Sequence, residues 1–157
     1  MMITVESIME SNVITIKDTA SLRDVWKLFS KKKINSAPIV DKRSHLIGII
    51  SKEDMLQLLY PDYRAYVSDI GIEKYVLEDK EFATVMKEKV SEVMNRNVIH
   101  THRQTSIMRA LGRMIANRVN QLPVVDDENH VVGIMTKGQI FEGLYKLHKS
   151  LFRKKSK

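Results

Sequence analysis

The sequence contains no cysteine and no long apolar run. The absence of cysteine excludes disulfide scaffolds, thiolate metal sites and cysteine nucleophiles. No run approaches the roughly 18 consecutive apolar residues of a membrane helix, so we expect no membrane span. Residues 1–6 lack the basic region and the apolar stretch of a signal peptide. The lack of a membrane span and of a signal peptide makes a cytoplasmic protein the default expectation, whereas the lack of cysteine fits a reducing or an oxidising compartment equally well.

Acidic residues are outnumbered, with 19 Asp and Glu against 26 Lys and Arg, which gives a net charge of +7 at pH 7. This balance suggests an anionic partner. The cations are spread along the chain, with dense runs only at residues 31–33 and 153–157. A basic tail binding nucleic acid or an acidic membrane face is therefore an alternative function, although nucleic acid is not the partner that we favour. Such binding would weaken steeply with added salt.

The chain repeats itself. A shift of 85 residues places Gly48 on Gly133, and the segment 48–54 on the segment 133–139. About a quarter of the paired positions are identical and most others exchange one apolar residue for another, which is typical of a duplicated structural unit. Identical pairs include Met9 with Met94, Ser21 with Ser106, Asn35 with Asn120, Pro38 with Pro123, His45 with His130 and Lys52 with Lys137.

Each repeat is predicted to fold as β-α-β-β-α after a short helical turn, within an α/β domain. Segments 13–16 and 98–101 are expected to be extended. Helices follow from the caps Ser21 and Ser106, with a capping box between Ser21 and Asp24. The spacing predicts inner faces formed by Leu22, Val25, Trp26, Leu28 and Phe29, and by Ile107, Ala110, Leu111, Met114 and Ile115.

Two strands and a second helix complete each repeat. Short strands are expected to start at the prolines Pro38 and Pro123, because proline is tolerated at a strand end. Acidic turns at 41–44 and 126–129 then lead into the buried strands 46–50 and 131–135. The final helices should start near Lys52 and Lys137.

The expected organisation is a first repeat at 1–60, an insert at 61–89, a second repeat at 90–147 and a basic tail at 148–157. The insert has no counterpart in the repeat and carries tyrosines at 63, 66 and 75. We expect it to be a partly helical covering element, with Phe82, Val85 and Met86 facing inward on a helix within 79–89.

The two copies, each with a proline-led strand, an acidic turn and a Gly-apolar-apolar-Ser/Thr strand exit, resemble the cystathionine beta-synthase (CBS) domain family. The tandem arrangement is similar to a Bateman module. The resemblance implies two repeats packed about a pseudo-twofold axis as one intramolecular pair, often in disc-like homodimers. It also implies clefts that bind AMP, ADP, ATP or S-adenosylmethionine in a regulatory module, commonly without catalysis and without a cofactor. A regulated partner protein would then be expected, but the sequence does not name it.

The resemblance places a first adenosine site at the junction of strand and helix around Ser51 and Asp54. There a carboxylate would accept both ribose hydroxyls, while a hydroxyl and a helix N-terminus would face phosphate. Ile49 and Ile99 would hold adenine. The candidate residues are Ile49, Ser51, Lys52, Asp54, Met94, Val98, Ile99, Val119, Asn120, Gln121 and Pro123.

A second, weaker site would be built around Thr136. Here Gln139 replaces the carboxylate and lacks its charge, and His100 stands where Thr15 stands in the first repeat. The candidate residues are Met9, Val13, Ile14, Ile34, Asn35, Ser36, Pro38, Ile134, Thr136 and Gln139.

Simpler explanations exist for the same residues. Ser51 with Asp54, and Thr136 with Gln139, also have the spacing of helix capping boxes, which need no ligand. His100 and His102 share one face of a strand as metal ligands would, but no further ligands are evident, so we expect no metal site. The residues include no nucleophile with a base, and the sequence therefore does not support catalysis. The third alternative is a structural dimer module with empty clefts. Whichever function holds, we expect dimerisation through helices of both repeats, where Leu56, Leu59, Phe141 and Leu144 are apolar positions near the helix ends.

Overall fold

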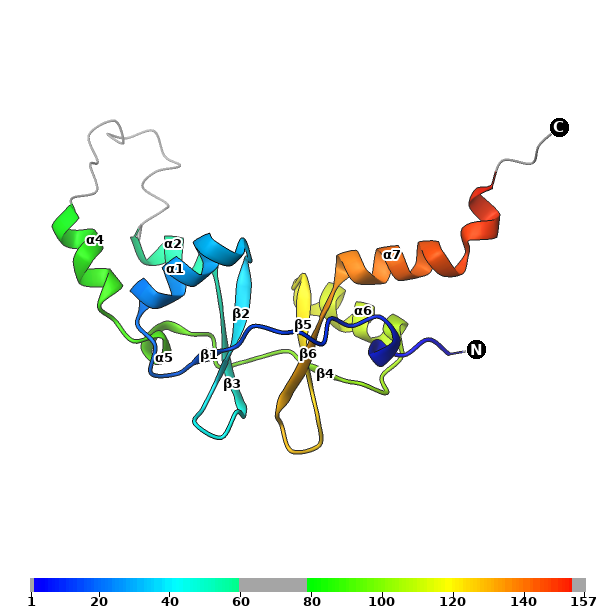
Figure 1. Ribbon diagram of the computed structural model, residues 1–157, viewed down its shortest axis with the longest axis horizontal. Coiled ribbons are helices and arrows are strands. Elements are labelled where there is room, and N and C mark those ends of the chain that lie inside the picture. The colour runs from blue at the N-terminus through cyan, green and yellow to red at the C-terminus, as the bar shows by residue number, and fades with distance from the viewer. Residues whose placement is uncertain (1, 60–78, 154–157) are drawn as a thin grey trace. The chain divides into compact units, whose positions relative to one another are not determined.

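The computed structural model describes residues 2–59 and 79–153 and has the mixed α/β architecture that the sequence predicts (Figure 1). Its elements, in chain order, are η1 (Val5–Ser7), β1 (Ile16–Lys17), α1 (Leu22–Lys32), β2 (Ser36–Val40), β3 (Leu46–Ser51), α2 (Lys52–Leu59), α4 (Asp79–Met86), α5 (Val90–Val93), β4 (Thr101–His102), α6 (Ile107–Asn117), β5 (Gln121–Val125), β6 (Val131–Thr136), α7 (Lys137–Leu147) and η3 (Lys149–Phe152).

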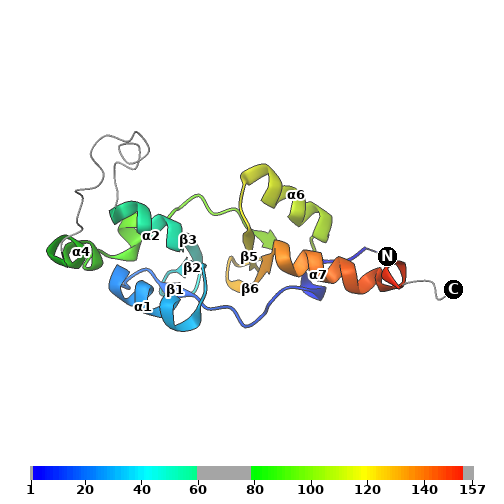
Figure 2. The same ribbon diagram turned by 90° about the horizontal axis from the view of Figure 1, so that it is seen from above.

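The described residues form two compact units, one from Ile14–Val98 and one from Met1–Val13 with Ile99–Lys157. We call them the first-repeat unit and the second-repeat unit. Each holds a three-stranded sheet, in the order β1-β2-β3 or β4-β5-β6. In Figure 2, α1 and α2 lie side by side along the first sheet, and α6 and α7 lie side by side along the second.

The opening turn of each repeat packs on the other repeat's helices and strands. Val5 is completely buried in the core of the second-repeat unit, while Val90 is completely buried in that of the first. Backbone hydrogen bonds fix these segments at the starts of α6 and α1, from Ile107 N–H to Ile3 O (3.0 Å) and from Leu22 N–H to Glu88 O (2.9 Å). The chain therefore exchanges its opening segments between the two compact units.

The predicted caps and most inner helix faces are confirmed. Ser21 and Asp24 form the expected capping box of α1, and Ser106 caps α6. On α4, Met86 is buried and Phe82 packs against the first core. The prediction for Ile115 is wrong, since 61% of its surface is exposed. It lies one position beyond the buried Met114, where α6 has turned away from the sheet.

Two strand predictions need correction. Of the predicted extended segments 13–16 and 98–101, only the last residue of each, Ile16 and Thr101, is paired in a sheet. Each strand then continues for one residue beyond the predicted end, to Lys17 and to His102. The prolines also do not start their strands. Pro38 is the third residue of β2, and Pro123 is the third residue of β5.

Hydrogen bonding explains why a central strand accepts Pro38. Its partner across β2 and β3 is Ile49, whose N–H and C=O both bond to Asn95 instead, at 3.0 and 2.9 Å. Pro38 and Ile49 therefore exchange no hydrogen bond. Because the Ile49 carbonyl already accepts from Asn95, the N–H group that proline lacks leaves no carbonyl of β3 without a donor. On the other side β1 starts opposite Ile39, one residue later. The second-repeat unit repeats this arrangement with Pro123, Ile134 and Glu10.

The prediction that Leu59 takes part in a dimer contact is wrong, because Leu59 is buried. Leu144 is partly buried and packs against the second core. Leu56 and Phe141 are exposed as expected. The tyrosines at 63, 66 and 75 and the end of the basic tail at 154–157 lie outside the described residues.

Candidate functional site

In the first-repeat unit, the candidate site is the junction at which β3 runs directly into α2. The Ser51 N–H donates to Asp54 Oδ2 (2.8 Å), and the Asp54 N–H donates to Ser51 Oγ (3.0 Å). The reciprocal pair of bonds is a capping box, so this simpler explanation of the motif is correct for the structure. Both side chains are half-buried and therefore remain accessible from solvent.

Capping does not use the whole carboxylate. The Ser51 N–H bonds to Oδ2, and an ionised carboxylate has about four acceptor positions on its two oxygens. Asp54 can thus cap α2 and still accept a ribose hydroxyl. Lys52, exposed on the first turn of α2, adds a cation beside it.

The equivalent junction in the second-repeat unit has different chemistry. The Thr136 N–H donates to Gln139 Oε1 (2.8 Å), and the Gln139 N–H donates to Thr136 Oγ1 (3.1 Å). Because the cap uses the single amide oxygen, the other polar group at the end of Gln139 is an NH₂ donor. One junction therefore offers a charged acceptor, whereas the other offers mainly a neutral donor.

In each unit, the first residue of the neighbouring strand and the residue before it lie against the junction. In the first-repeat unit, Ser36 pairs with Ser51 across the sheet, and the Lys52 N–H donates to Asn35 O (2.8 Å). In the second, Gln121 pairs with Thr136, and the Lys137 N–H donates to Asn120 O (3.1 Å). Residues predicted for different adenosine sites are therefore neighbours within one unit.

Each unit contributes to both predicted sites. The first-repeat unit holds six residues of the first site and five of the second: Ile49, Ser51, Lys52, Asp54, Met94 and Val98, then Ile14, Ile34, Asn35, Ser36 and Pro38. The second-repeat unit holds the others: Ile99, Val119, Asn120, Gln121 and Pro123 of the first site, then Met9, Val13, Ile134, Thr136 and Gln139 of the second.

The residues that follow each opening turn have a role that was not predicted from the sequence. Asn95 forms a two-way backbone bridge with Ile49, and Glu10 forms one with Ile134. A β-carbon at Gly133 would lie 2.9 Å from both the Glu10 carbonyl oxygen and Met9 Sδ. The signal was present in the identical pairs Gly48–Gly133 and Met9–Met94, because a glycine in a buried strand often marks a close approach of another backbone.

The acidic turns are ordered by one carboxylate each. Asp41 Oδ1 accepts the N–H groups of Arg43 (2.8 Å) and His45 (3.0 Å), and Oδ2 lies 3.1 Å from His45 Nδ1. These backbone hydrogen bonds, that of His45 foremost, lower the pKa of Asp41 below its usual 3.8 against an opposing effect of burial. Asp126 makes the same contacts with Glu128 and His130, and its pKa is lowered for the same reasons.

His100 and His102 contact each other. The rings of His100 and His102 lie edge to face with centroids 5.6 Å apart, as expected for residues on one face of a strand. His102 Nδ1 lies 3.2 Å from the carbonyl oxygen of Val125. Within residues 2–59 and 79–153, no three His, Asp or Glu side chains are grouped so as to hold a metal ion.

Two tandem α/β units, each with a capped strand-to-helix junction, define the class of the protein. The model of the CBS domain matches residues 5–61 and again residues 90–146. The chain therefore belongs to the CBS domain family and carries two copies of the domain.

Several proteins are similar over most of this chain. The protein MJ1426 of Methanocaldococcus jannaschii is 32% identical over 155 residues, which cover 89% of this chain and 90% of that one. Among solved structures, the CBS domain pair of protein MJ0100 in complex with 5′-methylthioadenosine and S-adenosyl-L-methionine has a TM-score of 0.69 and 26% identity. The alignment covers 94% of this chain and 99% of that one. The CBS-pair protein CBSX2 from Arabidopsis thaliana has a TM-score of 0.77 at 20% identity, covering 95% and 99%, and supports the fold alone.

Other relatives are much longer than this chain. The match covers 35% of MJ1232 of M. jannaschii, 22% of a homoserine O-acetyltransferase of Methanocorpusculum labreanum and 21% of an inosine-5′-monophosphate dehydrogenase of M. jannaschii. Their names describe proteins of which this chain matches only a part. Over the residues that the structure describes, no helix is long and apolar enough to cross a membrane.

Proposed function

We propose that this chain is a regulatory module that senses an adenosine-containing ligand. The observation that carries the proposal is its similarity, over nearly the whole length of both chains, to the MJ0100 CBS domain pair solved with two adenosine compounds. The half-buried Asp54 carboxylate beside a helix N-terminus supplies chemistry that such a ligand requires.

In this proposal the first site is the stronger one. Asp54 accepts the ribose hydroxyls, and Ser51 with the start of α2 faces the phosphate or another polar group on the 5′ side. The apolar residues predicted for the site, Ile49 and Ile99 among them, hold the adenine. The second site, around Thr136 and Gln139, binds the same class of ligand more weakly because it lacks the carboxylate.

Isothermal titration calorimetry on the full chain tests the proposal, with AMP, ATP, S-adenosylmethionine and 5′-methylthioadenosine as separate titrants. We expect at least one to bind and to raise the melting temperature, because a ligand of the folded state stabilises it. Binding should change little between low and high salt. If none binds, the proposal is wrong, and the module with empty clefts becomes the better description.

We also propose that the module forms homodimers through α6 and α7. Five large hydrophobic side chains are exposed on these helices: Met108, Ile115, Phe141, Tyr145 and Leu147. Their exposure favours a protein contact. Sedimentation equilibrium should show a dimer that Phe141→Glu dissociates, and a wild-type monomer at all concentrations would contradict the proposal.

A further inference from the structure

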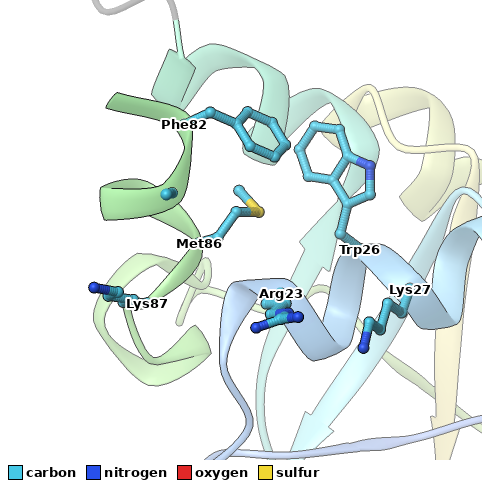
Figure 3. Close-up of a pocket in the computed structure, with 7 residues that line it drawn as sticks. Arg23, Trp26, Lys27, Phe82, Met86 and Lys87 are labelled. Carbon is cyan, nitrogen blue, oxygen red and sulfur yellow. The ribbon is translucent and has the colours of Figure 1, made fainter. Parts of the chain in front are cut away.

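Helices α1 and α4 enclose a pocket of about 420 Å³ in the first-repeat unit. Trp26, Phe82 and Met86 point into it in Figure 3, where α1 and α4 supply opposite walls. Ala83 completes the apolar lining. The volume falls within the range of roughly 300–1,000 Å³ that is usual for small-molecule sites. None of these residues belongs to either adenosine site proposed above.

Contacts at both ends of the pocket hold its two walls, α1 and α4, together. The rings of Trp26 and Phe82 meet edge to face, with centroids 5.4 Å apart and planes at 78°. At the other end, the segment after α4 is hydrogen-bonded to the start of α1, from Leu22 N–H to Glu88 O (2.9 Å) and from Val90 N–H to Ala20 O (2.8 Å). The pocket is therefore a product of packing and backbone pairing.

Among the described residues, the charged side chains that line the pocket all have one sign. Arg23, Lys27 and Lys87 line it together with the apolar residues, and no carboxylate of the described ranges does. In the described part of the chain, none of the three cations forms an ion pair. Concave apolar surface beside cations that form no ion pair within the described residues favours a ligand that has an apolar body and an anionic group.

The duplicated repeat provides an internal comparison. The positions equivalent to Arg23, Trp26 and Lys27 on α6 are Met108, Leu111 and Gly112. The second repeat thus keeps the helix and its capping serine but carries neither the cations nor the tryptophan. Folding of a CBS repeat does not require this set of residues, which is consistent with a ligand-binding role confined to the first repeat.

We propose that the α1–α4 pocket binds an amphipathic organic anion, whose planar or alkyl body packs against the apolar wall formed by Trp26, Phe82 and Met86. A carboxylate, sulfonate or phosphate group of the ligand faces Arg23, Lys27 and Lys87. This second ligand class is separate from the adenosine ligand and does not depend on it.

Trp26 makes the test direct, because it is the only tryptophan in the chain. The probe is 8-anilinonaphthalene-1-sulfonate, and its matched neutral control is N-phenyl-1-naphthylamine, which has the same rings without the sulfonate. We expect the sulfonate to quench Trp26 fluorescence saturably and to bind about tenfold more tightly than the neutral compound, since three cations face its charged group. Saturating S-adenosylmethionine and the substitution Asp54→Asn should leave the probe affinity unchanged.

Two double variants that remove the same charge distinguish binding in the pocket from electrostatic attraction of the sulfonate to any positively charged surface. Arg23→Gln/Lys27→Gln should weaken the sulfonate about fivefold or more, whereas Lys31→Gln/Lys32→Gln removes the same charge from the exposed end of α1 and should change affinity less than twofold. Trp26→Leu, which installs the residue of the second repeat, should weaken both probes, as read from probe emission. Circular dichroism melting checks that each variant is folded.

Three outcomes would overturn the proposal. The first is an absence of saturable quenching, and the second is equal affinity for the charged and neutral probes. The third is equal weakening by the two double variants. Because none of these readings involves an adenosine compound, the pocket proposal and the proposed sensing function succeed or fail independently.

Discussion

The side chain of Met94 lies directly on Gly48, so that a β-carbon at position 48 would overlap its sulphur and lie 2.8 Å from its Cγ. This contact brings Asn95 to the edge of β3, where it forms the backbone bridge with Ile49. The opening segment of the second repeat is thereby attached to the sheet of the first. The glycine is required because only hydrogen fits between strand and methionine.

Substituting alanine for Gly48 or Gly133 should show how much stability is lost when a methyl group is added at each close contact. Gly48→Ala meets chiefly the flexible Met94 side chain, whereas Gly133→Ala meets the Glu10 backbone at 2.9 Å. Each should lower the free energy of unfolding by about 1–3 kcal/mol. Adding Met94→Ala to Gly48→Ala should cost less than the sum of the single changes, while adding Met9→Ala to Gly133→Ala should relieve little.

The control for this series is Gly112→Ala. No atom lies within 4 Å of a β-carbon at this exposed position of α6, so alanine should stabilise the protein by about 0.5–1 kcal/mol. Urea denaturation of the four single variants, the two double variants and Gly112→Ala measures all of these effects. Additive costs for positions 48 and 94 would contradict the contact described here.

Substitutions at Asp54 should separate capping from ligand binding. Asp54→Asn keeps an oxygen for the Ser51 N–H but removes the charge, so it should preserve most stability and weaken an adenosine ligand about tenfold, or 1.4 kcal/mol. Asp54→Ala removes the cap as well and should lower the free energy of unfolding by about 0.5–2 kcal/mol.

Gln139→Ala is the matched control for Asp54→Ala. It removes the equivalent cap of α7 at a similar cost in stability but should barely change the affinity of the stronger site. Calorimetric titration and thermal melting of the same three variants provide both readings. Wild-type affinity in Asp54→Asn would remove Asp54 from the proposed site.

Removing the hydroxyl group of Thr101 should stabilise the folded protein. Its side chain is completely buried, and Oγ1 has no hydrogen-bond partner within the described residues. The equivalent position of the first repeat is the buried apolar Ile16. Thr101→Val should raise the free energy of unfolding by about 1–2 kcal/mol, because an unsatisfied buried hydroxyl is costly. Thr101→Ser, which keeps the hydroxyl and loses the methyl, should instead destabilise in the same urea titration.

The acidic turns predict a loss of stability in acid. The folded-state pKa values of Asp41 and Asp126 are lowered below 3.8, so the unfolded chain binds protons first as the pH falls. The stabilisation is present above about pH 4 and is lost as the pH falls through the folded pKa. Melting temperatures measured from pH 6 to pH 2.5 should therefore decline most steeply below pH 4.

Asp41→Asn/Asp126→Asn should flatten this decline, because asparagine can accept the same backbone N–H groups without titrating. Lys42→Ala lies in the same turn as Asp41 and leaves the carboxylate and its donors in place. It should therefore keep the wild-type shape of the curve. An unchanged decline in the double asparagine variant would show that other carboxylates dominate acid denaturation.

The sequence by itself determined the duplication, the α/β class, the helix caps and the family, because these features depend on residues close together or on spacing that recurs after 85 positions. Ser21 with Asp24 is one such local signal, since a cap needs only a hydroxyl and an acceptor three residues apart. Tertiary structure alone decided which repeat each opening segment joins, why Pro38 fits a central strand and how Trp26 and Phe82 form one pocket. Those outcomes depend on contacts between residues far apart in the chain, such as Gly48 with Met94, whose partner no local pattern specifies.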